Sequence, residues 1–232
     1  MSVVGGKEFL LDGKRILITG AAGALGREVT AVAESLGAKA VLVDLAFPEG
    51  FREDSEKYIV NLSDAAAVNA VLGNLNDIDA VFNIAGGFNM GPTVYETTSE
   101  DWDGLFTLNV KTAKHVIDVM VPKMIARGKG AVVNVGAYGA LTGQANMSAY
   151  CGSKGVVMKM TESLADEVRD KGVNVNAVLP TIIDTPANRA AMPDADFEQW
   201  VAPADLGRVM CFLASDAAKA IHGALLPVRG LS

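Results

Sequence analysis

The sequence has few of the residues that form cross-links or bind metals. It contains two cysteines, Cys151 and Cys211, and two histidines, and neither pair lies close together in the chain. There is no CxxC pair and no histidine cluster. The sequence therefore predicts neither a disulfide framework nor a metal site.

Long apolar runs and basic clusters are also missing. Residues 1–8 lack a basic region followed by an apolar core, and no apolar stretch reaches the roughly 18 residues that span a bilayer. The 27 acidic residues outnumber the 20 basic ones, which gives a formal net charge of −7. We therefore expect a cytoplasmic protein that binds neither nucleic acid nor an anionic membrane.

Apolar residues, in contrast, make up 50% of the chain, enough for one sizeable core. Short β-rich runs recur, separated by segments long enough for helices, and they lack strict alternation, as strands buried on both faces do. This predicts one α/β domain over residues 1–232, a doubly wound parallel sheet with helices on both faces (a Rossmann fold). Residues 184–203 look irregular and would form a substrate lid. The predicted strands are 15–19, 40–44, 58–61, 80–84, 131–135, 173–179 and 224–228.

A glycine-rich turn, TGAAGALG at residues 19–26, follows the first predicted strand and leads into a helical run. Glycines here permit close approach of the backbone to a pyrophosphate, whose charge faces the positive end of the helix. The second strand ends in Asp44, about 18 residues past Gly26. That carboxylate would accept hydrogen bonds from the adenosine ribose and repel a 2′-phosphate. The pattern predicts NAD(H) in preference to NADP(H).

A candidate acid–base pair lies in the segment YCGSK at residues 150–154. On a helix, Tyr150 and Lys154 would share one face. A phenol has a pKa of about 10, and a neighbouring ammonium, helped by the positive ring of an oxidised nicotinamide, would lower it toward a useful value. The spacing alone is common by chance, and a packed tyrosine beside a solvated lysine is the plain alternative.

Together these motifs resemble the short-chain dehydrogenase/reductase family. The glycine-rich turn, NIAG at 83–86, Asn109 in LNV, YCGSK, and VNAVLP at 175–180 follow the family's order and span nearly the whole chain. The resemblance implies an NAD-dependent enzyme acting on a small molecule. Tyr150 and Lys154 would be catalytic, with Lys154 also holding the nicotinamide ribose and Asn109 carrying a water in a proton relay.

The resemblance also implies a homodimer or homotetramer, with Val156, Val157 and Met160 at a subunit contact. It places Asn61 and Leu62 at the adenine and Ile183 and Thr185 at the carboxamide. The full set of implied cofactor residues is Gly20, Gly23, Leu25, Gly26, Asp44, Asn61, Leu62, Asn83, Ala85, Gly86, Tyr150, Lys154, Pro180, Ile183 and Thr185.

One position departs from the family pattern. The family has a serine thirteen residues before the tyrosine, where its hydroxyl donates to the substrate carbonyl, and this chain has Ala137 there. Losing one such donor costs on the order of 100-fold or more in rate. Either another hydroxyl substitutes, for which Tyr138, Thr142 and Ser148 are candidates, or the substrate does not need the donor.

Several segments resemble the dihydropteridine-reductase branch of the superfamily, which also lacks the serine. They are VLPTIIDTPANR at 178–189, MPDADF at 192–197, and AGGF at 85–88, in which Phe88 would offer a stacking surface. A quinonoid dihydropterin accepts hydride into a conjugated ring, so protonation by Tyr150 would suffice. Phe88 and Ala137 are the expected substrate contacts, although Asn83 and Asn109 follow the broader family.

Three hypotheses remain open from the sequence. The first is a reductase of a quinonoid or similarly conjugated acceptor, and the second is an alcohol/ketone dehydrogenase that lacks the usual serine. The third is a non-catalytic NAD-binding sensor or interaction protein. A silent protein would not need Asn109, Tyr150 and Lys154 in register, which favours the first two.

Overall fold

The seven strands form one parallel sheet in the order β3-β2-β1-β4-β5-β6-β7. The computed structural model describes residues 11–232. This arrangement confirms the predicted doubly wound fold, since the strand order runs outward in both directions from β1 and β4. The strands are β1 (Arg15–Thr19), β2 (Lys39–Asp44), β3 (Glu56–Ile59), β4 (Ala80–Asn83), β5 (Gly130–Val135), β6 (Val173–Pro180) and β7 (Leu225–Val228).

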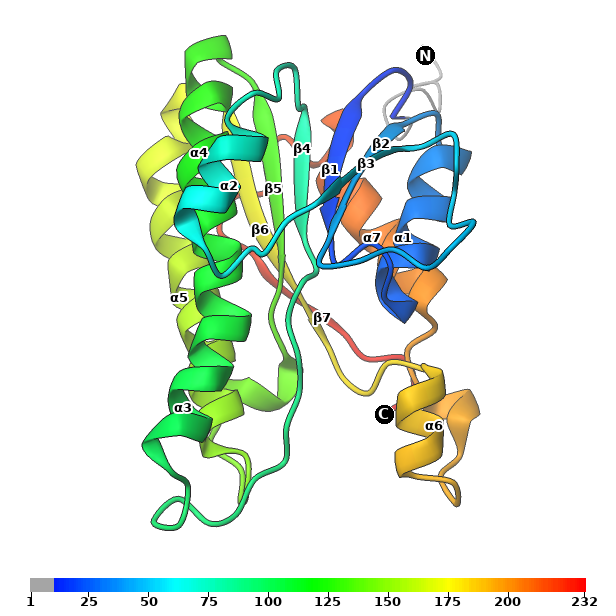
Figure 1. Ribbon diagram of the computed structural model, residues 1–232, viewed down its shortest axis with the longest axis vertical. Coiled ribbons are helices and arrows are strands. Elements are labelled where there is room, and N and C mark those ends of the chain that lie inside the picture. Colours follow the sequence, from blue (N-terminus) through cyan, green and yellow to red (C-terminus); the bar gives the residue numbers. More distant parts are fainter. Residues whose placement is uncertain (1–10) are drawn as a thin grey trace, which may run out of the picture.

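Helices cover both faces of the sheet (Figure 1). On one face lie α1 (Ala24–Ser35) and α7 (Pro203–Leu213), and on the other lie α2 (Ala65–Leu72), α4 (Thr112–Arg127) and α5 (Ser148–Val168). In β1, Ile16 and Ile18 enter the core on the α1 side, whereas Leu17 enters the core on the α4 side. All three are fully buried, so strict alternation of apolar and polar residues is absent from this strand.

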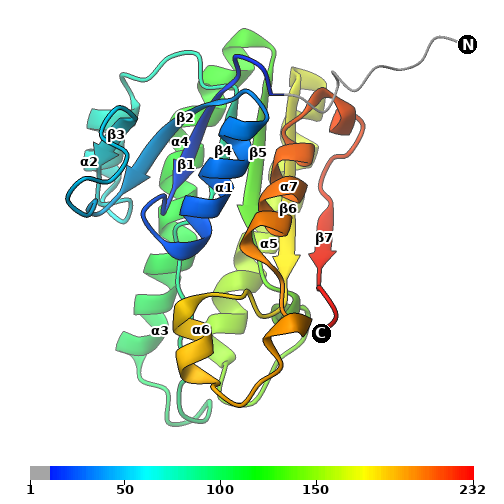
Figure 2. The same cartoon turned by 90° about the vertical axis from the view of Figure 1, so that its right-hand side faces the viewer.

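Two segments extend past the carboxyl ends of the strands (Figures 1 and 2). One is α3 (Ser99–Phe106), which continues through a π-helical turn, Thr107–Lys111, into α4. The other is α6 (Pro186–Ala191), within the predicted lid. Because the strand order reverses between β1 and β4, a crevice opens at this edge, and the two segments flank it.

The helix predicted to form a subunit contact is α5. Val157 on this helix is 2% exposed, so it has almost no surface to offer a second chain. Val156, in contrast, is 39% exposed. Between residues 11 and 232, no helix combines the length and the apolar character needed to cross a membrane.

Candidate active site

A cavity of about 2240 Å³ lies at the carboxyl edge of the sheet and is lined by residues from most of the strand ends. The structure brings nearly all of the predicted site residues to this one cavity. These are Gly20, Gly23, Leu25, Gly26, Asp44, Asn61, Leu62, Ala85, Gly86, Phe88, Ala137, Tyr150, Lys154, Pro180, Ile183 and Thr185.

The start of α1 faces the cavity. Gly23 is the N-cap residue, no side chain caps the helix, and its first turn contains no acidic residue. The positive end of the helix is therefore left open to an anionic ligand. A Cβ atom at Gly26 would lie 2.1 Å from the Gly20 carbonyl oxygen, so this tight turn excludes any larger residue there. These features fit the pyrophosphate of a dinucleotide.

Asp44 ends β2 beside this turn. Its carboxylate accepts hydrogen bonds from the backbone N–H groups of Ala22, at 2.8 Å, and of Leu45, at 2.7 Å. Both bonds fix the side chain at the rim of the cavity, which Asp44 lines. The arrangement leaves a negative charge where an adenosine ribose would lie.

Tyr150 and Lys154 lie on α5 with both side chains at the cavity. Lys154 is 6% exposed, and its ammonium donates to the Val135 carbonyl oxygen at 2.8 Å. This bond ties the lysine to the end of β5 and points its charge into the cavity. The two residues thus have the positions that proton chemistry at the end of β5 requires.

Burial shifts the pKa of both groups. It lowers the pKa of Lys154 from 10.5 to about 8 and raises the pKa of Tyr150 from 10.0 to about 12, with the nearby Cys151 adding a smaller upward contribution. The sequence predicts that Lys154, together with the positive ring of an oxidised nicotinamide, lowers the pKa of Tyr150. In the structure, desolvation of the phenolate raises this pKa instead. Tyr150 is therefore fully protonated at neutral pH and suited to donate a proton.

Asn109 is 2% exposed and is not among the residues that line the cavity, so its expected role in carrying a water stays a prediction. Its Oδ1 accepts from the Gly87 N–H at 2.9 Å. Its Nδ2 donates to the Gly87 carbonyl oxygen at 3.0 Å and to Ser153 Oγ at 3.1 Å. Protein partners thus occupy the side chain, which holds the loop after β4 against α5.

Asn83 also differs from its predicted place on the adenosine side. It is 4% exposed, and its Nδ2 donates to Asn134 Oδ1 at 2.8 Å across the β4–β5 pair. Asn134 in turn donates to Thr161 on α5 at 2.9 Å. Asn83 is the last residue of β4, and its buried side chain contacts Asn134 of β5 and is not among the residues that line the cavity.

The position of the missing serine is a buried methyl group. Ala137 is 5% exposed and lines the cavity next to Tyr138. Among the candidate substitutes, Thr142 is exposed and lies outside the cavity, and Ser148 lines a separate, smaller pocket. The Tyr138 hydroxyl accepts a hydrogen bond from Arg229 at 3.3 Å. Thr142 and Ser148 therefore do not replace the serine hydroxyl, whereas the Tyr138 hydroxyl lies at the cavity and is held by Arg229.

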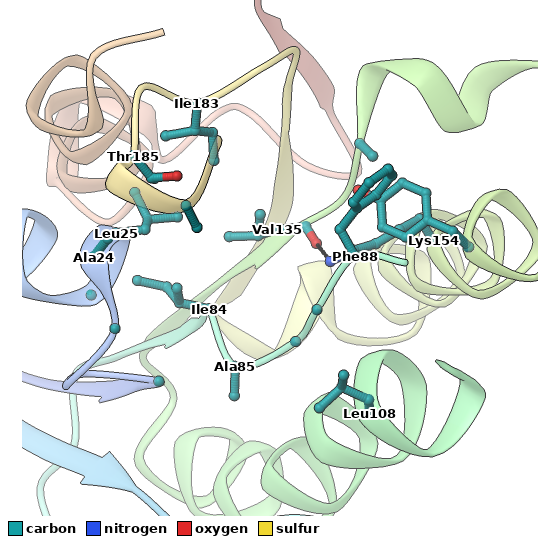
Figure 3. Close-up of a pocket in the computed structure, with 18 of the residues that line it drawn as sticks. Ala24, Leu25, Ile84, Ala85, Phe88, Leu108, Val135, Lys154, Ile183 and Thr185 are labelled. Carbon is teal, nitrogen blue, oxygen red and sulfur yellow. Dashed lines mark hydrogen bonds between the residues drawn. The ribbon is translucent and has the colours of Figure 1, made fainter. Parts of the chain in front are cut away.

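Phe88 contributes an aromatic surface to the cavity. Its ring meets the Tyr150 ring edge to face, with centroids 4.9 Å apart and planes at 81°. The side chain is 59% exposed. In Figure 3, Phe88 and Lys154 lie on one side of the pocket, and Leu25, Ile183 and Thr185 lie on the opposite side. The space between them separates the glycine-rich turn from the acid–base pair.

Several cavity residues were not identified from the sequence. Ile84, Val135 and Leu108 form apolar walls, and Arg229 adds a cation beside Tyr138. Ile84 and Arg229 each directly follow a strand, and Val135 ends one. Ligands of doubly wound sheets bind at the carboxyl ends of strands, so the places of these three residues in the sequence could have predicted that they line the site. Leu108 had no such signal, because it lies within the π-helical turn.

Known proteins resemble this chain along nearly its full length. A family model described as enoyl-(acyl carrier protein) reductase matches residues 6–230. L-xylulose reductase of Bos taurus is 31% identical over 236 residues, covering 95% of this chain and 96% of that protein. The 3-oxoacyl-(acyl-carrier-protein) reductase FabG of Thermotoga maritima is 29% identical over 241 residues, covering 95% and 98%.

Solved structures agree in fold. A putative NAD(P)-dependent gluconate 5-dehydrogenase from Beutenbergia cavernae, solved with bound NADP, superposes with a TM-score of 0.88 at 28% identity, covering 96% of this chain and 98% of that one. A Rossmann sheet with a tyrosine–lysine pair at its crevice is the architecture of a nicotinamide-dependent oxidoreductase. The chain belongs to the short-chain dehydrogenase/reductase family of oxidoreductases.

Proposed function

We propose that this protein uses NAD(H) to transfer a hydride to a small conjugated acceptor, of which a quinonoid dihydropterin is the model compound. The nicotinamide ring, when bound, supplies or accepts the hydride. The residues fitted to hold the nucleotide are those at the start of α1, Asp44, and the segments around Ala85 and Ile183.

The preference for NAD(H) rests on charge. The cavity residues at the end of β2 include the carboxylate of Asp44, and the basic residues among the cavity lining are Lys154 and Arg229, from α5 and the end of β7. A 2′-phosphate at the adenosine ribose would therefore meet a negative charge and no lining cation.

The preference for a conjugated acceptor rests on Ala137. With a methyl group at this position, the serine donor of the family is absent, and we assign the proton to Tyr150, whose pKa of about 12 keeps it protonated. A ketone gains much of its reactivity from a second donor on its oxygen. A conjugated ring that takes hydride at one atom and a proton at another needs only one donor, and the Phe88 ring offers a face for stacking.

The test follows NADH oxidation with quinonoid dihydropterin generated in the assay, corrected for non-enzymatic reduction. We expect turnover that falls at least 100-fold in the Tyr150→Phe variant. This variant keeps the ring packed against Phe88, so its fold should not change. Turnover that survives the loss of the hydroxyl, or NADH binding without any turnover, would contradict the proposal.

An alcohol/ketone dehydrogenase is the second candidate, favoured by relatives named for carbonyl substrates, such as L-xylulose reductase. The Ala137→Ser variant distinguishes the two. If the wild-type substrate is a conjugated acceptor, the new hydroxyl should change its kcat by less than about threefold and leave ketones poor substrates. A gain of about 100-fold on ketones would show that only the donor was missing.

A non-catalytic NAD-binding sensor is the third hypothesis from the sequence. A sensor would use Lys154 to hold the nucleotide, but it would have no use for the Tyr150 hydroxyl in the same cavity. Redox turnover with any acceptor, lost in Tyr150→Phe, separates an enzyme from a sensor.

A further inference from the structure

Arg229 stands at the substrate end of the cavity, directly after β7. Its guanidinium stacks on the Tyr138 ring, with Cζ 4.6 Å from the ring centroid, and Nη1 donates to the Tyr138 hydroxyl at 3.3 Å. Tyr138 follows Ala137 in the chain, so the stacked pair lies next to the position of the missing serine. A cation is thus held beside the place where a substrate would react.

Within residues 11–232, no Asp or Glu forms an ion pair with Arg229, and its Nη2 has no hydrogen-bond acceptor. Its Nε donates to the main-chain oxygen of Ser232, the last residue of the sequence, at 2.9 Å. The outer Nη edge of the guanidinium is therefore available to a ligand, and Tyr138 fixes its orientation.

The other charges in the cavity leave Arg229 as the available cation. Lys154 is buried and donates to Val135. The acidic lining residues are Asp44, at the end of β2, and Glu100 and Asp103, on α3, all on elements other than β7. An anionic group on a substrate would thus be attracted to Arg229 and repelled from the α3 side of the cavity.

We infer that Arg229, oriented by Tyr138, is an anion-binding site that selects substrates carrying a carboxylate. This inference rests on the proposed function and deepens it: among small conjugated acceptors, it favours those that carry a carboxylate over uncharged ones such as the model dihydropterin. A guanidinium presents N–H groups in a fixed plane that matches the two oxygens of a carboxylate. The carboxylate binds at the end of β7 while the reacting atom lies between Tyr150 and the nicotinamide site.

Binding of benzoate and benzamide to the NADH complex tests the site without requiring turnover. The two ligands have the same shape and differ in charge. We expect wild-type protein to bind benzoate more tightly than benzamide, and Arg229→Met to weaken benzoate binding about 10- to 100-fold with little change for benzamide. Arg229→Lys should recover part of the affinity. Equal benzoate affinities in wild type and Arg229→Met would overturn the inference.

Two controls separate the site from bulk charge and from misfolding. Arg208→Met removes an arginine on α7 that pairs with Asp205 and does not line the cavity. Its benzoate affinity should match wild type, and an equal loss in both arginine variants would overturn the inference. NADH affinity should be unchanged in Arg229→Met. Tyr138→Leu, which removes the stacking ring, should weaken benzoate binding but less than Arg229→Met.

Turnover gives a second readout that fails independently of the proposed function. With 4-oxo-2-pentenoate and its methyl ester, we expect the acid to have the higher kcat/KM in wild type and the preference to disappear in Arg229→Met. If neither compound is reduced but benzoate binding depends on Arg229, the proposed function fails and the anion site stands. If the ester is preferred by wild type, the anion site is wrong.

Discussion

Burial has opposite consequences for the two titratable groups of the site. It holds the proton on Tyr150, whose pKa rises to about 12, and it weakens the hold of Lys154 on its proton, whose pKa falls to about 8. The pair is therefore set, before any nucleotide binds, for proton donation by the tyrosine near neutral pH. The positive ring of an oxidised nicotinamide would lower the pKa of Tyr150, which favours proton acceptance by the tyrosine when a substrate is oxidised.

The shifted pKa of Lys154 makes stability depend on pH. Its pKa is about 8 in the folded chain against 10.5 when unperturbed, so the unfolded chain binds more protons between these values. The free energy of unfolding therefore rises with pH across that window. The cost of burying the charge is fully present below pH 8, on the order of 3 kcal/mol, and is gone above the unperturbed pKa.

Lys154→Met removes this dependence. We expect the stability of the variant relative to wild type to fall by roughly 3 kcal/mol as the pH rises from about 7 to about 10.5. Urea unfolding at a series of pH values measures the difference. Tyr150 is present in both proteins, so its destabilising ionisation above pH 10 cancels. If the free energies of unfolding of the two proteins change in parallel with pH, the pKa of Lys154 is not lowered in the folded state.

At the scale of elements, Asn109 joins three segments that are distant in the sequence. It lies in the π-helical turn, contacts Gly87 in the loop after β4, and donates to Ser153 on α5. The loop that carries Phe88 is thus fixed against the helix that carries Tyr150. The Asn109 side chain therefore sets how the loop of Phe88 lies relative to Tyr150.

Gly86→Ala tests this connection. A Cβ at Gly86 would lie 2.6 Å from Asn109 Oδ1 and 3.5 Å from Lys154 Nζ, so the asparagine must move. We expect a loss of about 1–3 kcal/mol in the free energy of unfolding, together with a drop in kcat of about tenfold or more. Gly91→Ala is the matched control, because a Cβ there meets nothing within 4 Å. If Gly86→Ala behaves like this control, Asn109 does not hold the loop tightly.

Most of the strands were predictable because they are short, apolar and buried; β3 and β7 contain no buried residue. β1 was placed at its observed bounds, and β3 was placed two residues late. The π-helical turn at Asn109 was not predictable, since its partners Gly87 and Ser153 lie far away in sequence. The same holds for Arg229, whose contact with Tyr138 spans 91 residues and exists because β7 pairs beside β6.

At the scale of the whole molecule, the cavity draws on both halves of the sheet. The start of α1 and the end of β2 form one end, and α5, β6 and the end of β7 form the other. A nucleotide bound across the crevice between β1 and β4 would therefore contact segments from the first and the second half of the chain at once. Binding of that kind stabilises the entire domain by linkage, not one element alone.

Thermal unfolding with each nucleotide turns this linkage into a test of cofactor choice. At a concentration 100 times its Kd, NADH should add about 2.7 kcal/mol to the free energy of unfolding, which raises the Tm by roughly 5–10 °C in a domain of this size. NADPH at the same concentration should raise it far less, because its 2′-phosphate meets Asp44. Asp44→Ser removes the negative charge, so the difference between the Tm increases with NADH and with NADPH should become smaller. Equal shifts with NADH and NADPH in the wild-type protein would show that Asp44 does not discriminate between them, and the NAD(H) preference would fail while the shared dinucleotide site remained.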